Sequence, residues 1–378
     1  MSQKKQEAMN ELHIDKTHWK KYRFDEMVQN IAERVEPSQT DLDVYVGLEH
    51  IDPDCLHLSR HGHPSDVEGT KLRFYKGDII FGRRRAYQRK TALATTDGIC
   101  SAHAMVVRAK EDVIDPMFLP FLFHSKSFID MAITISVGGL SPTINWKDIA
   151  KQEFLLPPKA EQKRLAELLW AADEVVEKEK REREKLEEFR KLTFEQHTSK
   201  QANAKLSDCL IISKKKSKVP HNHDKYIGLE HKESGAYTTV QYGNPQEVLA
   251  DSYIFKKGDL LYSKLRPYLD KCIIADFDGI CSTEIIVYNT NPITSKEYII
   301  NVLHSKAFLD YIVDKSFGTK MPRVSHELVA DYQFYLPQKE KQDEIMTIIG
   351  NMKKQEFKLR EQIALSQQIK QDLIDKVF

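Results

Sequence analysis

The pentapeptide DGICS at residues 97–101 recurs unchanged at residues 278–282, and this repetition shows how the chain is organised. Outward from it, further matching segments occur in the same order in both halves of the chain. These pairs are YVGLEH at 45–50 with YIGLEH at 226–231, FYKGDII at 74–80 with FKKGDLL at 255–261, HSK at 124–126 with HSK at 304–306, and FLLPP at 154–158 with FYLPQ at 334–338. The offset is 181 residues up to DGICS and 180 residues after it. Ordered matches at a nearly constant offset indicate a tandem duplication.

The length and composition agree with a duplicated, folded protein. The chain has 378 residues, which is more than twice the usual domain length of roughly 150 residues. Apolar residues make up 41% of the chain and charged residues 30%, so a disordered or collagen-like chain is excluded. The formal net charge is only +1, so any basic surface has to be local.

The cysteine content and the start of the chain predict a cytoplasmic location. Five cysteines form no C-x-x-C pair, and the opening MSQKKQEAMNELH has no apolar signal core. No apolar run approaches the roughly 20 residues that a membrane-spanning helix needs, so membrane functions are excluded.

Each repeat is predicted to be an α+β unit followed by a long helix. Short apolar stretches separated by Gly and Pro indicate a β-rich module. Residues 161–197 and 341–377 contain no Gly or Pro except Gly350, and their apolar residues recur at helical spacing. The predicted apolar seams consist of Leu165, Leu168, Ala172, Val175, Leu186, Phe189 and Thr193 in the first helix, and Ile345, Ile348, Met352, Leu359, Ile363 and Ile369 in the second.

Pairing the two helices buries both seams. We therefore expect an antiparallel coiled coil with internal pseudo-twofold symmetry, and a β-rich module at each end of it. The charged run EKEKREREK at 177–185 is expected to form a solvated face of the first helix.

The candidate binding residues form a basic segment that occurs at the same place in both repeats. Arg and Lys match phosphate oxygens and the guanine edge, and Tyr can donate to a phosphate or pack on a sugar. A solvated strand end with surface ion pairs would give a similar sequence. The recurrence of the basic segment in both copies favours DNA binding instead. The candidates are Arg83, Arg84, Arg85, Tyr87, Arg89 and Lys90 in the first repeat, Lys264, Arg266, Tyr268 and Lys271 in the second, and Lys320 and Arg323 farther along the second.

Catalytic and metal-binding patterns are weak by comparison. The histidines at 57, 61 and 63 and those at 221 and 223 have no matching ligands in the other repeat, so we interpret them as structural or surface residues. Asp78 and Asp259 lie in KGD turns, where an acidic residue is ordinary turn chemistry. No phosphate-binding loop, dinucleotide fingerprint or nucleophile elbow occurs, so the chain is predicted to be a binder and not an enzyme.

Between the repeated anchors the two copies differ. GGLSPTINW, starting at residue 138, corresponds to GTKMPRVSH, starting at residue 318. Drift after duplication explains such differences, and so does a scaffold used twice for two different ligands.

From about Tyr22 to Phe378, the sequence resembles the specificity subunit of type I restriction-modification systems. The resemblance rests on FYKGDIIFGRRRAYQRK, DGICS and the FLLPP-x-x-EQ-x-x-L start of the long helix. It implies target-recognition domains at 22–157 and 201–337 and long spacer helices at 158–200 and 338–378. The sequence departs from the family pattern in an N-terminal extension at 1–21.

The resemblance also implies partners and cofactors. Such a subunit reads a bipartite double-stranded DNA target and recruits two methyltransferase subunits and motor-nuclease subunits. S-adenosylmethionine, ATP and Mg are then expected only in these partners, and no cofactor or metal in this chain. The alternatives are a structural adaptor that binds no DNA and a stand-alone nuclease, which would need a repeated carboxylate and Lys site that the sequence lacks.

Overall fold

The computed structural model describes residues 14–239 and 241–378, and these form two compact units. The first unit extends to Arg181 and also includes Leu359–Phe378, whereas the second is the continuous segment Glu182–Lys358. Residues 1–13 of the predicted N-terminal extension lie outside the described residues. The first strand of the first unit, β1, already begins at Lys20.

The first unit contains two four-stranded sheets and one two-stranded sheet. The strand orders are β2-β9-β6-β7, β3-β5-β8-β4 and β1-β10, and only β4 and β8 pair in parallel. The strands are β1 (Lys20–Arg23), β2 (Val28–Ile31), β3 (Arg34–Val35), β4 (Tyr45–Val46), β5 (Lys71–Phe74), β6 (Ile79–Phe81), β7 (Thr91–Leu93), β8 (Gly98–Cys100), β9 (Met105–Ala109) and β10 (Glu153–Leu156).

The second unit repeats this topology strand for strand. Its orders are β12-β19-β16-β17, β13-β15-β18-β14 and β11-β20, again with one parallel pair, β14 and β18. The strands are β11 (Ala204–Lys205), β12 (Leu210–Ser213), β13 (Lys216–Ser217), β14 (Tyr226–Ile227), β15 (Ser252–Phe255), β16 (Leu260–Ser263), β17 (Cys272–Ile274), β18 (Gly279–Cys281), β19 (Ile285–Thr290) and β20 (Gln333–Phe334). The prediction of two β-rich domains in tandem is confirmed.

Two of the repeated motifs meet local structural constraints. A Cβ on the glycine of DGICS would lie 2.8 Å from the Val44 carbonyl in the first unit, and 2.6 Å from the Lys225 carbonyl in the second. The serine of HSK caps the helix that follows: Ser125 Oγ accepts from the amide of Phe128, and Ser305 Oγ from that of Phe308. Backbone contact and helix capping therefore account for these two motifs.

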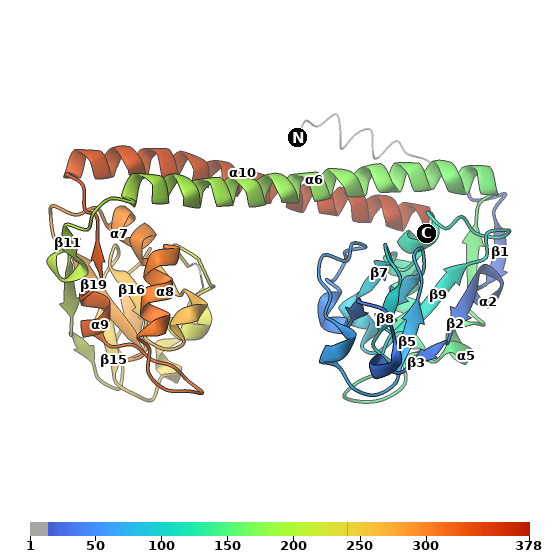
Figure 1. Ribbon diagram of the computed structural model, residues 1–378, viewed down its shortest axis with the longest axis horizontal. Coiled ribbons are helices and arrows are strands. Elements are labelled where there is room, and N and C mark those ends of the chain that lie inside the picture. The colour runs from blue at the N-terminus through green and yellow to red at the C-terminus, as the bar shows by residue number, and fades with distance from the viewer. Residues whose placement is uncertain (1–13, 240) are drawn as a thin grey trace. The chain divides into compact units, whose positions relative to one another are not determined.

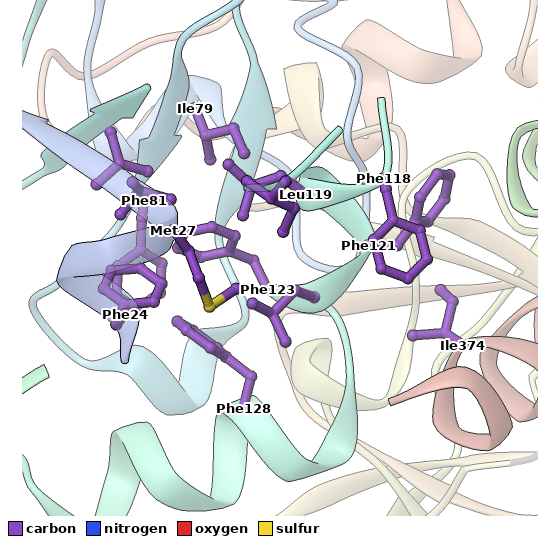
Figure 2. Packing of buried hydrophobic residues seen from close by; sticks show 14 of the residues in the cluster. Phe24, Met27, Ile79, Phe81, Phe118, Leu119, Phe121, Phe123, Phe128 and Ile374 are labelled. Carbon is purple, nitrogen blue, oxygen red and sulfur yellow. The ribbon is translucent and has the colours of Figure 1, made fainter. Parts of the chain in front are cut away.

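Alternation along β6 builds two cores in the first unit. Ile79 and Phe81 face the short helices, while Ile80 faces the other four-stranded sheet, as expected from the two-residue period of a strand. On the helix side, Phe81 packs with Phe123 and Phe128, with ring centroids 5.4 and 5.5 Å apart (Figure 2). In the second unit, Leu260 and Tyr262 of β16 face one core and Leu261 faces the other.

Short helices cover the first core of each unit. They are α2 (Phe24–Met27), α3 (Leu119–Leu122), α4 (Lys126–Thr134) and α5 (Trp146–Ile149) in the first unit, and α7 (Lys296–Leu303), α8 (Lys306–Asp314) and α9 (His326–Ala330) in the second.

The two predicted long helices are present, as α6 (Lys159–Thr198) and α10 (Lys339–Val377). In the first unit, Asp173 of α6 binds Lys370 of α10, and farther along α6 the carboxylate of Glu179 accepts from Gln362. Since the partner's number falls as the α6 number rises, the helices are antiparallel, as predicted (Figure 1). In the second unit, Arg190 of α6 pairs with Glu356 of α10.

The predicted seam of α6 is right at some positions and wrong at others: Leu165 is buried, and Ala172, Leu186 and Thr193 are partly buried. Leu168, Val175 and Phe189 are exposed, with 41, 49 and 59% of their surface accessible. Besides Leu165, the buried residues of α6 are Gln162, Ala166, Leu169, Asp173, Val176, Glu179, Arg190 and Phe194. The spacing of apolar residues does not reveal this buried face of α6, because charged residues occupy three of its positions. The buried Glu179 also shows that the run at 177–185 is not solvated throughout.

No helix within residues 14–239 and 241–378 combines the length and the apolar character needed to cross a membrane.

Candidate nucleic-acid interface

The basic segment of each unit connects two neighbouring strands, β6 to β7 in the first unit and β16 to β17 in the second. We call residues 82–90 and 263–271 the basic loops. Each contains one 3-10 turn, Ala86–Gln88 or Pro267–Leu269. A residue with left-handed backbone stands on either side of each turn: Arg85 and Arg89 with φ of 58° and 54°, and Arg266 and Asp270 with φ of 51° and 49°. This conformation is uncommon for residues other than glycine, so the surrounding structure has to hold both loops in shape.

A short hairpin supplies that support. In the first unit Val137 and Thr143 exchange backbone hydrogen bonds of 3.0 and 2.9 Å, and the amide of Arg85 donates to the Pro142 carbonyl at 2.7 Å. The second unit has the same bonds: Phe317 and Arg323 exchange bonds of 3.0 and 2.9 Å, and the Arg266 amide donates to the Pro322 carbonyl at 2.7 Å. We call residues 138–142 and 318–322 the hairpin tips.

In the first unit, three of the predicted residues form one cationic patch. The Arg84 guanidinium donates to Ser141 Oγ at 3.0 Å, and the Arg85 guanidinium donates to the same oxygen at 3.2 Å. The Arg83 guanidinium donates to the Ala102 carbonyl at 3.1 Å. Among the residues that the structure describes, no carboxylate pairs with these three groups, so their charges are not neutralised.

Two other predicted residues of the first loop are engaged inside the protein. The Arg89 guanidinium binds the Asp54 carboxylate, the His124 carbonyl at 2.8 Å and the Gln371 side chain at 3.2 Å. Lys90 Nζ donates to the Leu48 carbonyl at 2.5 Å. These contacts hold the loop to the rest of the unit.

In the second unit, too, some predicted residues are bound within the protein and others are not. Lys271 Nζ donates to the Leu229 carbonyl at 2.9 Å, which matches the contact of Lys90. The side chains of Lys264, Arg266 and Lys320 form no hydrogen bond or ion pair with any residue that the structure describes. The hairpin brings Arg323 beside this group, where its guanidinium donates to Glu284 at 3.3 Å.

Tyr87 and Tyr268 lie in the 3-10 turns and are exposed to 51 and 53%. Their exposed rings and hydroxyl groups can therefore contact a partner.

A recess lies next to each basic loop. The first, of about 350 Å³, is lined by Arg34, Lys71 and Arg83 among others. The second, of about 360 Å³, is lined by Lys214, Lys264 and Arg323 among others. The first recess therefore extends the positive surface away from its loop, whereas the second is also lined by Glu284 and Glu327.

Three residues near the loops were not predicted from the sequence. His103 accepts a hydrogen bond from Arg84 at 3.3 Å. Partial burial and the positive charges of Arg84 and Arg83 lower the pKa of His103, so its imidazole is neutral near pH 7. Glu284 occupies the position of His103 in the second repeat, and Leu140 stands at the first hairpin tip with 95% of its surface exposed. The sequence offers one signal for them, since all three differ between otherwise similar copies.

Two of the histidines singled out in the sequence make contacts within the protein. His57 Nε2 lies 2.6 Å from the Asp173 carboxylate, and His221 is buried between Ser217 and the Ala250 carbonyl. Within the described ranges, no three His, Cys, Asp or Glu side chains are grouped as metal ligands.

Comparisons with known proteins show which family the chain belongs to. The profile of the "Type I restriction modification DNA specificity domain" matches residues 65–188 and 205–371, which is most of the chain. The EcoDI type I restriction enzyme specificity subunit of Escherichia coli is 29% identical over 180 residues, covering 46% of this chain and 40% of the relative. The HindI specificity subunit of Haemophilus influenzae is 31% identical over 162 residues, covering 36% of this chain and 34% of the relative. The chain thus spans less than half the length of these curated relatives.

Solved structures share the fold over the whole chain. One belongs to a study described as "Structural basis underlying complex assembly and conformational transition of the type I R-M system", with a TM-score of 0.60, 17% identity, and coverage of 95% of this chain and 97% of that one. The type I restriction-modification S subunit from M. genitalium has a TM-score of 0.52 and 14% identity, with coverage of 97 and 98%. With the matching profile in both units, the chain belongs to the type I restriction modification DNA specificity domain family.

Proposed function

We propose that this chain is the DNA-specificity subunit of a type I restriction-modification complex. The observation that carries the proposal is a single scaffold, basic loop plus hairpin, built twice with the same backbone bonds and different side chains. A scaffold of this kind suits a target in two parts, one read by each unit. The recognition domains are then residues 22–157 and 201–337, joined by the long helices at 158–200 and 338–378.

Within this proposal, unpaired cations anchor the DNA backbone and residues nearby read the bases. The candidates for anchoring are the Arg83, Arg84 and Arg85 group in the first unit and Lys264 and Arg266 in the second. Contacts to phosphate fix the register on the duplex, and contacts to base edges supply the sequence preference. Arg89, Lys90 and Lys271 hold the loops in place instead, because their polar groups are already bound within the protein.

The chemistry is assigned to partner subunits. Methyltransferase subunits would modify adenine N6 with S-adenosylmethionine, and motor-nuclease subunits would use ATP and Mg²⁺. This chain contributes specificity and no catalytic step, and the complex would act on DNA in the cytoplasm.

The test is base-resolution mapping of N6-methyladenine in the source genome with and without the gene. We expect one split motif, methylated in both halves, to disappear when the gene is removed. An unchanged methylation map, together with no methyltransferase subunit bound to the purified chain, would contradict the proposal and favour an adaptor that does not bind DNA.

A further inference from the structure

Each hairpin tip presents a different side chain on the same backbone frame. Leu140 in the first unit and Lys320 in the second hold the same position, two residues after a glycine with left-handed backbone. Gly138 has a φ of 117° and Gly318 a φ of 96°. The backbone bonds that close the hairpin and join it to the basic loop are the same in both units and agree in length within 0.1 Å.

The tip of the first unit is held firmly although its leucine is exposed. Arg84 and Arg85 both donate to Ser141 Oγ, and Arg85 also donates to the Leu140 carbonyl at 3.4 Å. An apolar side chain with 95% of its surface in water, on a braced hairpin beside three unpaired cations, has no role in the core of the unit.

We infer that Leu140 and Lys320 read bases in the major groove, each in the half-site bound by its own unit. This inference rests on the proposed function. In the major groove an apolar side chain contacts the C5-methyl group of thymine, and a lysine donates to O6 and N7 of guanine. Leu140 therefore selects a T·A pair, and Lys320 selects a G·C pair.

The equivalence of the two positions favours groove reading over insertion between base pairs. A leucine is suited to either, but a lysine is not an apolar wedge. Because both units hold the position with the same frame, one mode of docking has to suit both residues. Reading in the major groove satisfies this condition.

Reciprocal substitution tests the inference. Leu140→Lys and Lys320→Leu are introduced separately into the full chain, purified with its methyltransferase partner, and used to select duplex DNA from a randomised pool. In Leu140→Lys, one base pair of one half-site changes preference from T·A to G·C by about tenfold. In Lys320→Leu, one base pair of the other half-site loses its preference for G·C to a similar extent.

Leu249→Lys is the matched control, since Leu249 is 88% exposed and lies outside both hairpins. It adds the same charge, and both half-sites should stay as in the parent protein. Unchanged base preferences in the two tip variants, or an equal loss of affinity for every sequence, would overturn the inference while leaving the proposed function intact. A parent protein that selects no sequence would overturn both.

Discussion

The basic residues of the two loops differ in whether their side chains already have hydrogen-bond partners in the protein. This difference decides which of them are available to bind phosphate. Arg89 makes three contacts inside the first unit, whereas Arg266 makes none through its side chain with the described residues. A guanidinium without a partner keeps its donors for phosphate oxygens. Identical residue types therefore have different predicted roles.

Arg266→Ala is expected to weaken DNA binding without reducing stability. Loss of one phosphate contact lowers affinity for all sequences alike, and the slope of log affinity against log salt becomes shallower by about 0.9. Titration of labelled duplex at several salt concentrations measures both effects.

Arg89→Ala is the contrasting variant. It removes bonds to Asp54, His124 and Gln371, so we expect a loss of about 1–3 kcal/mol in the free energy of unfolding. The salt slope should not change. A smaller slope in Arg89→Ala, or an unchanged slope in Arg266→Ala, would reverse the assignment.

Lys232 is a buried lysine at the position that Ile51 holds in the first repeat. Its Nζ donates to two carbonyls, of Leu261 and Lys271, and has no carboxylate partner within the described chain. Burial lowers the pKa of Lys232 from 10.5 to about 8. The folded state therefore binds this proton more weakly than the unfolded state does.

Lys232→Met is expected to stabilise the second unit, on the order of 2 kcal/mol below pH 8. The penalty in the parent protein is complete below the folded pKa, and it decreases as pH rises from about 8 towards 10.5, where the unfolded lysine also loses its proton. Urea unfolding at pH 7, 8.5 and 10 should show the two proteins converging. A difference independent of pH would show that packing, and not charge, is responsible.

At the scale of the elements, the pairing of α6 with α10 depends on buried charges. The Asp173 carboxylate lies 3.0 Å from Lys370 Nζ and 2.6 Å from His57 Nε2, and only 1% of the Asp173 side chain is exposed. Burial alone would raise the pKa of Asp173, but the bonds from His57 and Lys370 outweigh it and lower that pKa. The hydrogen bond to Asp173 in turn raises the pKa of His57.

Asp173→Ala is expected to destabilise the first unit by about 3–5 kcal/mol, because Lys370 would remain buried without a partner. The double variant Asp173→Leu with Lys370→Met should recover most of this loss, since an apolar pair needs no compensation. Hydrogen exchange of the first-unit amides measures the effect. Equal stability of the single and double variants would argue against an essential ion pair.

The same site predicts two pH effects. The folded pKa of His57 is raised, so its contribution is full below the unfolded value near 6.5 and is lost as pH rises through the folded pKa. The folded pKa of Asp173 is lowered, so its contribution is present above about 3.8 and is lost as pH falls through the folded pKa.

At the scale of the whole molecule, the first unit is discontinuous in sequence. Its core includes Leu373, Ile374 and Val377 from the end of α10, whereas the second unit is one continuous segment with parts of both long helices. Figure 2 shows Ile374 near Phe121 of the first unit.

Removal of residues 359–378 should therefore unfold the first unit and spare the second. Three buried aliphatic side chains at about 2 kcal/mol each are comparable with the total stability of a domain. In hydrogen exchange, amides before Arg181 should lose protection while those of Glu182–Lys358 keep it. Loss of protection in both units would mean that they do not fold independently.

DNA binding by the whole chain is expected to depend steeply on salt despite a net charge of +1. The five proposed phosphate anchors near the loops lack carboxylate partners in the described structure, so the slope should be about −4.5. A slope near zero would support the adaptor alternative.

The duplication, the α+β units, the two long helices and the position of the basic loops could all be predicted from the sequence. These follow from local causes: a glycine that allows close backbone contact, a serine that caps a helix, and alternation along short strands. Such constraints involve residues that are neighbours in the chain or leave a periodic pattern, so they can be recognised in the amino-acid sequence.

In contrast, the three-dimensional contacts were needed to show which cations have no partner in the protein and which face of α6 is buried. Arg89 meets Gln371 from the far end of the chain, and Asp173 meets Lys370, so neither partnership leaves a local signal. The energy of a buried charge depends on what lies opposite it in space, and a polar residue in a helix seam is therefore indistinguishable in sequence from a solvated one.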